Sequence, residues 1–333
     1  MPWDPNTLAA RVLSGDRTSI GQALSAVEDR RTTSAPAIAQ LLRALTASQA
    51  RSALRVGLTG PPGVGKSSLV AVLARELRNR NRRVGVLAVD PSSPRSGGAL
   101  LGDRARIDST LTDDGLFIRS MASGGDLGGL ARAAYSAVQV LAAGHDVVLV
   151  ETVGVGQSET DVELVADVTV LVLQPESGDT LQFLKAGILE IPDLFVINKA
   201  DLGQAASRAR HELDAMLKLA HSAGGLGDMP GVVMTSATSA QGVAELVDAL
   251  DARHAAFEAS GEIIRRRRAG AIAWCERALQ RRVGEAGLEL LGGRSDAARA
   301  IARRIDEGMH GFEVVAELGD SVIDRLKSAE PTR

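Results

Sequence analysis

The run GPPGVGKS at positions 60–67 has residue types and spacing that point to phosphate binding. It matches G-x-x-x-x-G-K-[ST] at every fixed position, follows a strand-like apolar run (55–58) and precedes a helix-like one (68–78). Glycines let the backbone curl so that successive N–H groups point at phosphate oxygens, and the helix adds the positive end of its dipole. The sequence therefore predicts that nucleotide phosphates bind here.

Lys66 and Ser67 are the loop side chains with predicted chemical roles. Lys66 would place a positive charge at the β- and γ-phosphates, which also makes it a catalytic candidate, and the Ser67 hydroxyl would ligate Mg²⁺. Nucleotide contacts are predicted for the loop and the start of the helix: Gly60, Gly63, Val64, Gly65, Lys66, Ser67 and Ser68.

The run Asn198-Lys-Ala-Asp201, directly after the apolar run 194–197, predicts which base is bound. The Asp201 carboxylate matches the two donors of guanine, N1–H and the 2-amino group, whereas adenine would leave it unpaired. Asn198 would fix the loop and the base edge, and the Lys199 stem would pack over the ring. Ser236 and Ala237 end the next strand, where a backbone N–H can meet guanine O6. GTP and GDP are the predicted ligands.

Three acids are candidate Mg²⁺ ligands beside Ser67. Glu151 ends an apolar run and is followed at +3 by Gly154, the layout of an acid that reaches toward Mg²⁺ and a glycine N–H that touches the γ-phosphate. Aspartate is more usual there, so the longer Glu151 favours contact through water or a changed geometry. Asp90 and Asp103 are the other two candidates, with a turn-forming role as the alternative for each.

The catalytic candidates are Lys66, Glu151 and Gln157. Small signalling GTPases carry a water-orienting glutamine directly after the glycine that Gly154 matches, but this chain has Val155 there. Gln157, two residues later, is the nearest replacement. We therefore expect slow intrinsic hydrolysis that a partner accelerates.

The elements that must position these residues follow from continuous apolar runs, which are typical of strands buried on both faces. They lie at 55–58, 84–89, 116–118, 147–150, 168–173, 194–197 and 232–234. With helical segments between them, they predict an α/β fold of the P-loop NTPase type. Its mostly parallel, doubly wound sheet would bind ligand at the carboxyl ends of the strands.

The two ends of the chain show helical spacing instead. We expect a helical N-terminal extension over 1–50, a P-loop GTPase domain over 51–258 and a helical arm over 259–333. The apolar stripes of the arm would pack either on the main domain or on a second copy of the chain. Twofold pairing is the commonest assembly, so we favour the second copy and a homodimer joined by the arm.

Composition limits the partners and the compartment. The chain has 38 Lys and Arg against 41 Asp and Glu and only 2% aromatic residues, so no nucleic-acid partner is expected. One cysteine, Cys275, excludes an internal disulfide and fits a reducing compartment. With no secretion signal and no apolar run of the ~18 residues that span a membrane, a cytoplasmic protein without a membrane partner is predicted.

Several of these motifs together resemble the MeaB/ArgK family, the MMAA-like G-protein chaperones of adenosylcobalamin-dependent methylmalonyl-CoA mutase. The run 151–158, ETVGVGQS, is the specific part of the resemblance, since the other motifs occur in many GTPases. The matching segments are 60–67, 89–94, 102–104, 151–158, 178–179 with Lys185, and 198–201.

This resemblance implies a GTPase that forms homodimers through its C-terminal helices and binds the mutase. It would couple GTP binding and hydrolysis to cofactor loading and protection. Phosphate and Mg²⁺ contacts would correspond to Lys66, Ser67, Asp90, Asp103 and Glu151, and a third switch to Gly178, Asp179 and Lys185. The segment 175–179 is more acidic than expected of the family, which leaves partner specificity open.

Three other functions stay open. A metal-insertion GTPase for urease or hydrogenase usually carries Cys-Pro-x-Cys or His-rich sites, whereas this chain has one cysteine and dispersed histidines. A transport-linked kinase or ATPase for basic amino acids would use ATP, and Asp201, which predicts guanine binding, argues against that function. A nucleotide-binding scaffold without useful turnover would act by switching shape alone.

Overall fold

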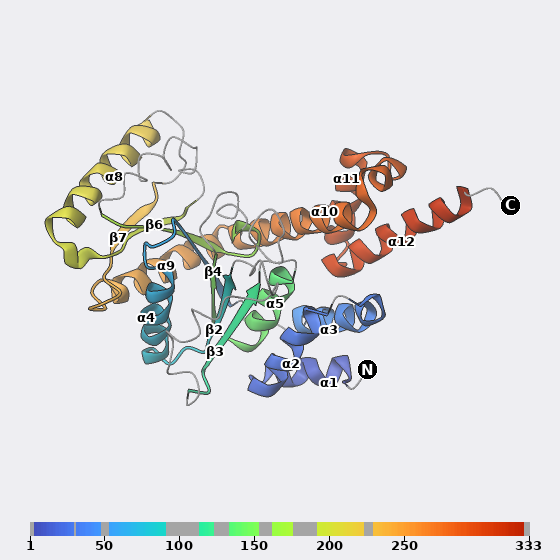
Figure 1. The fold of residues 1–333 in the computed structure, drawn as a ribbon, viewed down its shortest axis with the longest axis horizontal. Helices are drawn as coiled ribbons and strands as arrows, with labels where there is room; N and C mark the ends of the chain where they lie inside the picture. Colours follow the sequence, from blue (N-terminus) through green and yellow to red (C-terminus); the bar gives the residue numbers. More distant parts are fainter. Residues whose placement is uncertain are drawn as a thin grey trace. The chain divides into compact units, whose positions relative to one another are not determined.

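The seven runs predicted as strands form one sheet in the computed structural model, in the order β3-β2-β4-β1-β5-β6-β7 with parallel pairing throughout (Figure 1). The predicted parallel sheet is therefore confirmed. Its strands are β1 (Leu54–Thr59), β2 (Val84–Asp90), β3 (Leu116–Ala122), β4 (Val147–Glu151), β5 (Val168–Leu173), β6 (Leu194–Ile197) and β7 (Gly231–Met234).

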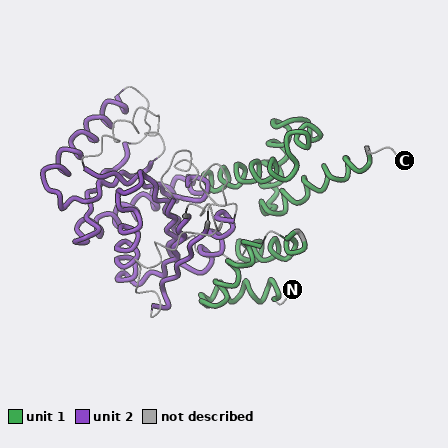
Figure 2. The backbone as a smooth tube through the Cα atoms, viewed as in Figure 1, with its two compact units in different colours: residues 1–49, 264–333 green, residues 50–263 purple. Residues whose placement is uncertain are grey.

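The structure describes residues 3–29, 31–47, 53–90, 113–122, 133–152, 162–175, 192–222 and 229–329. These form two compact units, Ala50–Ile263 and the pair of segments Met1–Gln49 and Ile264–Arg333 (Figure 2). The three-part division expected from the sequence stays a prediction. Outside the described residues lie Asp103, Gly154, Gln157, Gly178, Asp179 and Lys185, and also the side chain of Asp90.

Helices cover both faces of the sheet because alternate strand residues point to opposite sides. On one face α4 (Lys66–Asn79) and α9 (Val243–Ala259) pack on residues such as Val56 and Val170. On the other face α8 (Gln204–Ser222) packs on Leu171 and Phe195, and α5 (Ala134–Gly144) contacts β2 and β4. A sheet buried on both faces leaves its edges at the strand ends as the place for polar groups.

Aspartates close the amino-terminal edge of the sheet. Each lies directly before a strand, and its carboxylate accepts the backbone N–H of a residue at or next to the start of the neighbouring strand. The pairs are Asp146 with Arg83 (2.7 Å), Asp167 with Arg55 (3.0 Å) and Asp193 with Thr169 (2.8 Å). Since side chains of the protein satisfy these donors, the opposite, carboxyl edge is where a ligand finds backbone groups.

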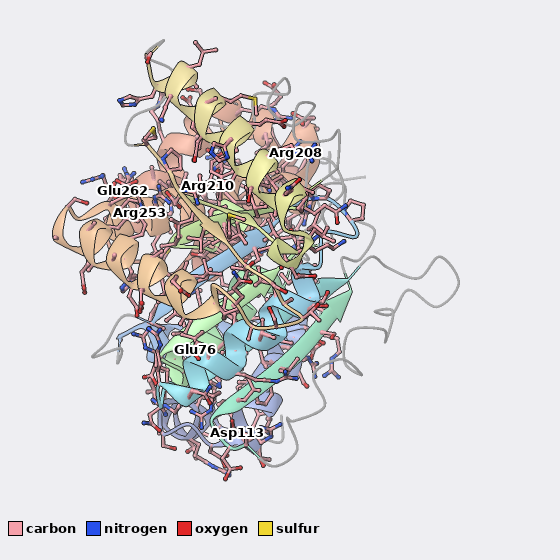
Figure 3. The ribbon with its side chains drawn as sticks, turned by 90° about the vertical axis from the view of Figure 1, so that its left-hand side faces the viewer. Glu76, Asp113, Arg208, Arg210, Arg253 and Glu262 are labelled. Carbon is pink, nitrogen blue, oxygen red and sulfur yellow. The ribbon has the colours of Figure 1, made fainter. Side chains whose placement is uncertain are left out.

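Helix α4, which follows the phosphate loop, is held at its far end by arginine pairs. Arg78 donates through Nε and Nη2 to the Asp113 carboxylate at 2.9 and 2.8 Å, and Arg80 Nε donates to Glu76 at 3.0 Å. Glu76 on α4 and Asp113 just before β3 are labelled in Figure 3. A planar guanidinium that donates two N–H groups to one carboxylate fixes the relative orientation of the two side chains as well as the distance between them.

The other unit consists of helices from both ends of the chain. They are α1 (Pro5–Leu13), α2 (Arg17–Val27), η1 (Thr32–Ser34), α3 (Ala35–Ala47), α10 (Glu262–Leu290), α11 (Arg294–Asp306) and α12 (Gly311–Ala329). Asp4 and Asp16 begin α1 and α2 by accepting N–H groups three residues on, at 2.7 and 2.9 Å. Within the described residues, no helix is both long and apolar enough to cross a membrane.

The apolar stripes of the C-terminal helices pack largely on one another, with Cys275, Ile301 and Leu318 in their core. These contacts among the C-terminal helices bury part of the stripes, and a homodimer through the arm stays a prediction. Arg43 of α3 also forms an ion pair with Glu313 of α12, which joins the N-terminal and C-terminal helices.

Burial, together with the charge of Arg43, lowers the pKa of His310 to about 4. The neutral ring accepts the Phe312 N–H at 3.2 Å, at the start of α12.

Candidate nucleotide-binding site

The predicted phosphate loop connects β1 to α4, and its three glycines have φ between +81° and +140°. The space around them differs. A Cβ on Gly60 would lie 2.2 Å from the Val172 carbonyl oxygen, and one on Gly65 would lie 2.6 Å from Asn198 Nδ2. A Cβ on Gly63 would meet nothing within 4 Å. A glycine at position 60 therefore lets the loop backbone lie close to the backbone of Val172. At position 63 a glycine is required only by the left-handed backbone conformation.

Lys66, the first residue of α4, is buried against its own loop. Its Nζ donates to the carbonyl oxygens of Gly60 at 2.8 Å and Pro61 at 2.9 Å. The two carbonyl dipoles thus stabilise the ammonium charge of Lys66. A bound phosphate would take the place of these carbonyl oxygens and offer the ammonium a full negative charge. Val64 beside it is fully buried, and Ser68 on the first turn of α4 is exposed.

Ser67 and Glu151 are brought together by the pairing of β1 with β4. The Ser67 hydroxyl donates to Glu151 Oε1 at 2.6 Å, and the Glu151 side chain is buried at the end of its strand. Asp90 ends the adjacent strand β2. A hydroxyl and a carboxylate are the hard oxygen ligands that Mg²⁺ prefers, so these residues fit the predicted ion.

Asn198 joins the phosphate loop to the base-reading segments. The side chain is 1% exposed, and its Nδ2 donates to the Val64 carbonyl oxygen at 2.9 Å. Its Oδ1 accepts the Ala237 N–H at 3.2 Å and the Thr235 hydroxyl at 3.3 Å. One amide group therefore holds the ends of β6 and β7 and the loop in a fixed relation.

Asp201 lies in the short helix η5 (Ala200–Leu202), where its side chain is exposed. Its Oδ1 accepts a hydrogen bond from the buried Ser236 hydroxyl at 2.5 Å. Ser236 is itself held, because its backbone N–H donates to the Gln241 carbonyl at 2.9 Å. The carboxylate that is predicted to read guanine is thus oriented by the segment that follows β7.

Lys199 adopts φ +60°, a conformation that residues with a side chain rarely take. Its Nζ donates to the Gly63 carbonyl oxygen at 3.1 Å and to Gln174 Oε1. Gln174 is not among the residues predicted from the sequence. Its signal was a polar residue directly after a buried strand, at the edge where the other site residues were expected.

The site residues that the structure describes gather at the carboxyl ends of the strands, where open parallel sheets bind ligands. They are the loop 60–68, Glu151, Asn198, Lys199, Asp201, Ser236 and Ala237. The predicted switch residues Gly178, Asp179 and Lys185, the γ-phosphate contact Gly154, the catalytic candidate Gln157 and the metal candidate Asp103 are outside the description. Their roles stay predictions.

Residues 20–289 match the family described as methylmalonyl Co-A mutase-associated GTPase MeaB. This chain belongs to the MeaB family. The predicted resemblance is therefore confirmed, and with its parallel sheet the MeaB-family chain is a P-loop GTPase.

Individual relatives agree with this assignment. A Pyrococcus abyssi protein named as a GTPase is 46% identical over 263 residues, which cover 78% of this chain and 79% of the relative. The GTPase ArgK of Escherichia coli is 36% identical, with 82% of this chain and 83% of ArgK covered. The mouse mitochondrial methylmalonic aciduria type A homolog is 37% identical, with 82% and 69% covered.

One solved structure resembles nearly the whole chain. The crystal structure of an LAO/AO transport system kinase superposes with a TM-score of 0.66 at 28% identity, and 96% of this chain and 97% of that chain are covered. The similarity extends over both compact units, so the helical segments belong to the shared architecture as well as the sheet.

Proposed function

We propose that this MeaB-family GTPase binds GTP at the carboxyl edge of its sheet and distinguishes guanine through Asp201. The observation that carries the proposal is the Asp201 carboxylate, oriented by Ser236 next to the Asn198 bridge to the phosphate loop. A guanine base would bury this carboxylate against two donors. An adenine base would bury it without a partner, at a cost of about 1–3 kcal/mol or more for a charged group.

Mg²⁺ is part of this proposal, with Ser67 and Glu151 as the residues that would hold it and Asp90 and Asp103 as further candidates. A Mg²⁺ ion held by these residues would supply positive charge that offsets the charge of the phosphates. Lys66 would turn from its loop carbonyls to the phosphates. Because Val155 stands where other GTPases carry the water-orienting glutamine, unaided hydrolysis would be slow.

We further propose that the protein is a chaperone of an adenosylcobalamin-dependent mutase, which it assists in cofactor loading and protection. Support comes from the family description, which names association with methylmalonyl-CoA mutase, and from the mouse relative. A homodimer joined by the C-terminal helices belongs to the same proposal. Ile323 and Leu326 of α12 are 36% and 50% exposed and would be covered in it. We place the protein in the cytoplasm, in keeping with its single cysteine.

Co-purification with methylmalonyl-CoA mutase, in GDP and in a non-hydrolysable GTP analogue, tests the partner. We expect binding that depends on the nucleotide, and single-turnover GTP hydrolysis at least about tenfold faster with the mutase than without it. Lys66→Ala is the control, since it would lose the nucleotide dependence. Absence of mutase binding in both nucleotide states, or fast hydrolysis by the isolated protein, would contradict the chaperone proposal.

The similarity to the LAO/AO transport system kinase favours one second candidate, an ATP-dependent role in basic amino-acid transport. Affinities for GTP and ATP, measured side by side by calorimetry, distinguish the two. Our proposal expects GTP to bind at least about 100-fold more tightly, the discrimination typical of a site whose polar groups a wrong ligand leaves unpaired. Equal affinities would favour the transport role.

A further inference from the structure

Gln174 connects the end of β5 to the base-reading segment. It follows Leu173, the last residue of β5, and its Oε1 accepts a hydrogen bond from Lys199 Nζ. The same Nζ donates to the Gly63 carbonyl oxygen at 3.1 Å. The ammonium of Lys199 therefore links three segments that are far apart in the sequence: the phosphate loop, the end of β5 and the turn after β6.

The backbone of Lys199 is already fixed on both sides. The Asn198 N–H donates to the Leu173 carbonyl at 2.8 Å, and the Ala200 N–H donates to the Thr235 carbonyl at 2.9 Å. The left-handed φ of Lys199 is thus imposed by its neighbours. What remains free to vary is the long side chain, which has many rotamers and loses entropy when it is held in one of them.

Gln174 supplies one of the acceptors that hold this side chain in place, beside the Gly63 carbonyl oxygen. Its amide oxygen is a neutral acceptor, so it orients the ammonium without cancelling its charge. Gln174 is only partly buried and lies at the edge of the sheet that carries the site, beside the predicted base-reading residues. A glutamine needed only for packing would not have to direct its oxygen at a lysine of this segment.

We propose that Gln174 is a positioning residue that holds Lys199 in the place it takes over a bound guanine base. This inference rests on the proposed function of Asn198 to Asp201. The contact lies on the base side, so it acts on GDP and GTP alike. It leaves the cleavage of bound GTP unchanged, because that step occurs at the other end of the nucleotide.

Stopped-flow dissociation and equilibrium titration of fluorescent GDP and GTP test the inference. In Gln174→Met, which keeps the length of the side chain but removes the acceptor, we expect Kd for both nucleotides to rise about five- to tenfold through faster dissociation. The single-turnover hydrolysis rate at saturating GTP stays as in the wild type. Gln174→Glu, which keeps an acceptor, retains Kd within about threefold of the wild type.

A double-mutant cycle separates positioning from a structural effect. If Gln174 acts through Lys199, Gln174→Met has no further effect on Kd in a Lys199→Met background. The inference would be overturned if Gln174→Met left Kd unchanged. It would also be overturned if Gln174→Met raised Kd in the Lys199→Met background by as much as it does in the wild type. If the wild type has no guanine preference, the proposed function fails first; if that preference is present and Gln174→Met is silent, only this inference fails.

Discussion

The base half and the phosphate half of the site are held in different ways. In the base half, Asn198 and Ser236 bind groups of the protein that a base would not displace, and Ser236 aims Asp201 outward. In the phosphate half, Lys66 donates to its own loop and Ser67 donates to Glu151. The groups proposed to bind phosphate and Mg²⁺ thus bond to groups of the protein, and under our proposal they would exchange these partners for the nucleotide and the ion.

From this difference we infer separate tasks for the two halves. A preorganised base half would lose little entropy on binding, and our proposal assigns it the selectivity. A phosphate half that exchanges partners takes up one arrangement without phosphate and another with it, which is the property that a nucleotide-dependent switch requires. The following variants should change one half and leave the other intact.

Removal of the Lys66 charge should have the largest effect on binding. Each hydrogen bond between the ammonium and a phosphate is worth about 1.5–3 kcal/mol, so Lys66→Ala should weaken GTP at least about 100-fold. Guanine preference among the residual binding should persist, because the base half is untouched. Titration of fluorescent GTP measures both. Lys218→Ala, an exposed lysine of α8, is the matched control, and a loss below about fivefold in Lys66→Ala would contradict this assignment.

Replacing each of the three loop glycines by alanine should lower the stability of the protein by a different amount. Gly60→Ala should cost more than about 3 kcal/mol, because its Cβ meets a backbone oxygen that cannot move away. Gly65→Ala should also be costly, because its Cβ would displace the Asn198 amide and break the hydrogen bond of that amide to the Val64 carbonyl. Gly63→Ala should cost only the left-handed conformation, about 1–2 kcal/mol. Urea unfolding measures the loss of unfolding free energy in each variant. Equal losses would show that the contacts of the added Cβ do not determine the cost.

Asn198→Ala should weaken the connection between the two halves. It leaves the Val64 carbonyl and the Ala237 N–H without their partner, which should cost about 2–3 kcal/mol of unfolding free energy. GTP and ATP affinities should also converge, because the base half is no longer fixed to the loop. Urea unfolding and paired titrations measure the two effects. A variant that is destabilised but keeps its full guanine preference would separate Asn198 from base recognition.

Glu151→Gln should have the smallest effect without Mg²⁺. The glutamine oxygen still accepts the Ser67 hydroxyl, so the nucleotide-free protein should lose less stability than in Asn198→Ala. With Mg²⁺, GTP affinity should fall about tenfold, because an amide is a weaker ligand for the ion than a carboxylate. Titrations with Mg²⁺ and with a chelator provide the comparison. Equal losses under both conditions would remove Glu151 from the metal site.

The sheet and the phosphate loop were predictable because their signals are local. A strand buried on both faces is a continuous apolar run, and the loop is a contiguous motif between a strand and a helix. The pair Asn198 and Asp201 was predictable for the same reason, since both belong to one short motif.

The contacts that the sequence did not reveal depend on which strands become neighbours. Gln174 meets Lys199 only because β5 lies beside β6, and Asp146, Asp167 and Asp193 act only on the strand next to their own. The pairing of α3 with α12 through Arg43 and Glu313 likewise joins segments from opposite ends of the chain. Helical periodicity shows that a stripe must be buried but not which partner buries it.

The binding of GTP and XTP to the wild type and to Asp201→Asn tests guanine recognition most directly. Xanthine carries a carbonyl where guanine carries the 2-amino group, so an asparagine amide that donates should suit it. We expect Asp201→Asn to lose about 100-fold in GTP affinity and to prefer XTP, while Asp214→Asn on α8 behaves as the wild type. An Asp201→Asn variant that still binds GTP as tightly as the wild type would contradict the role given to Asp201.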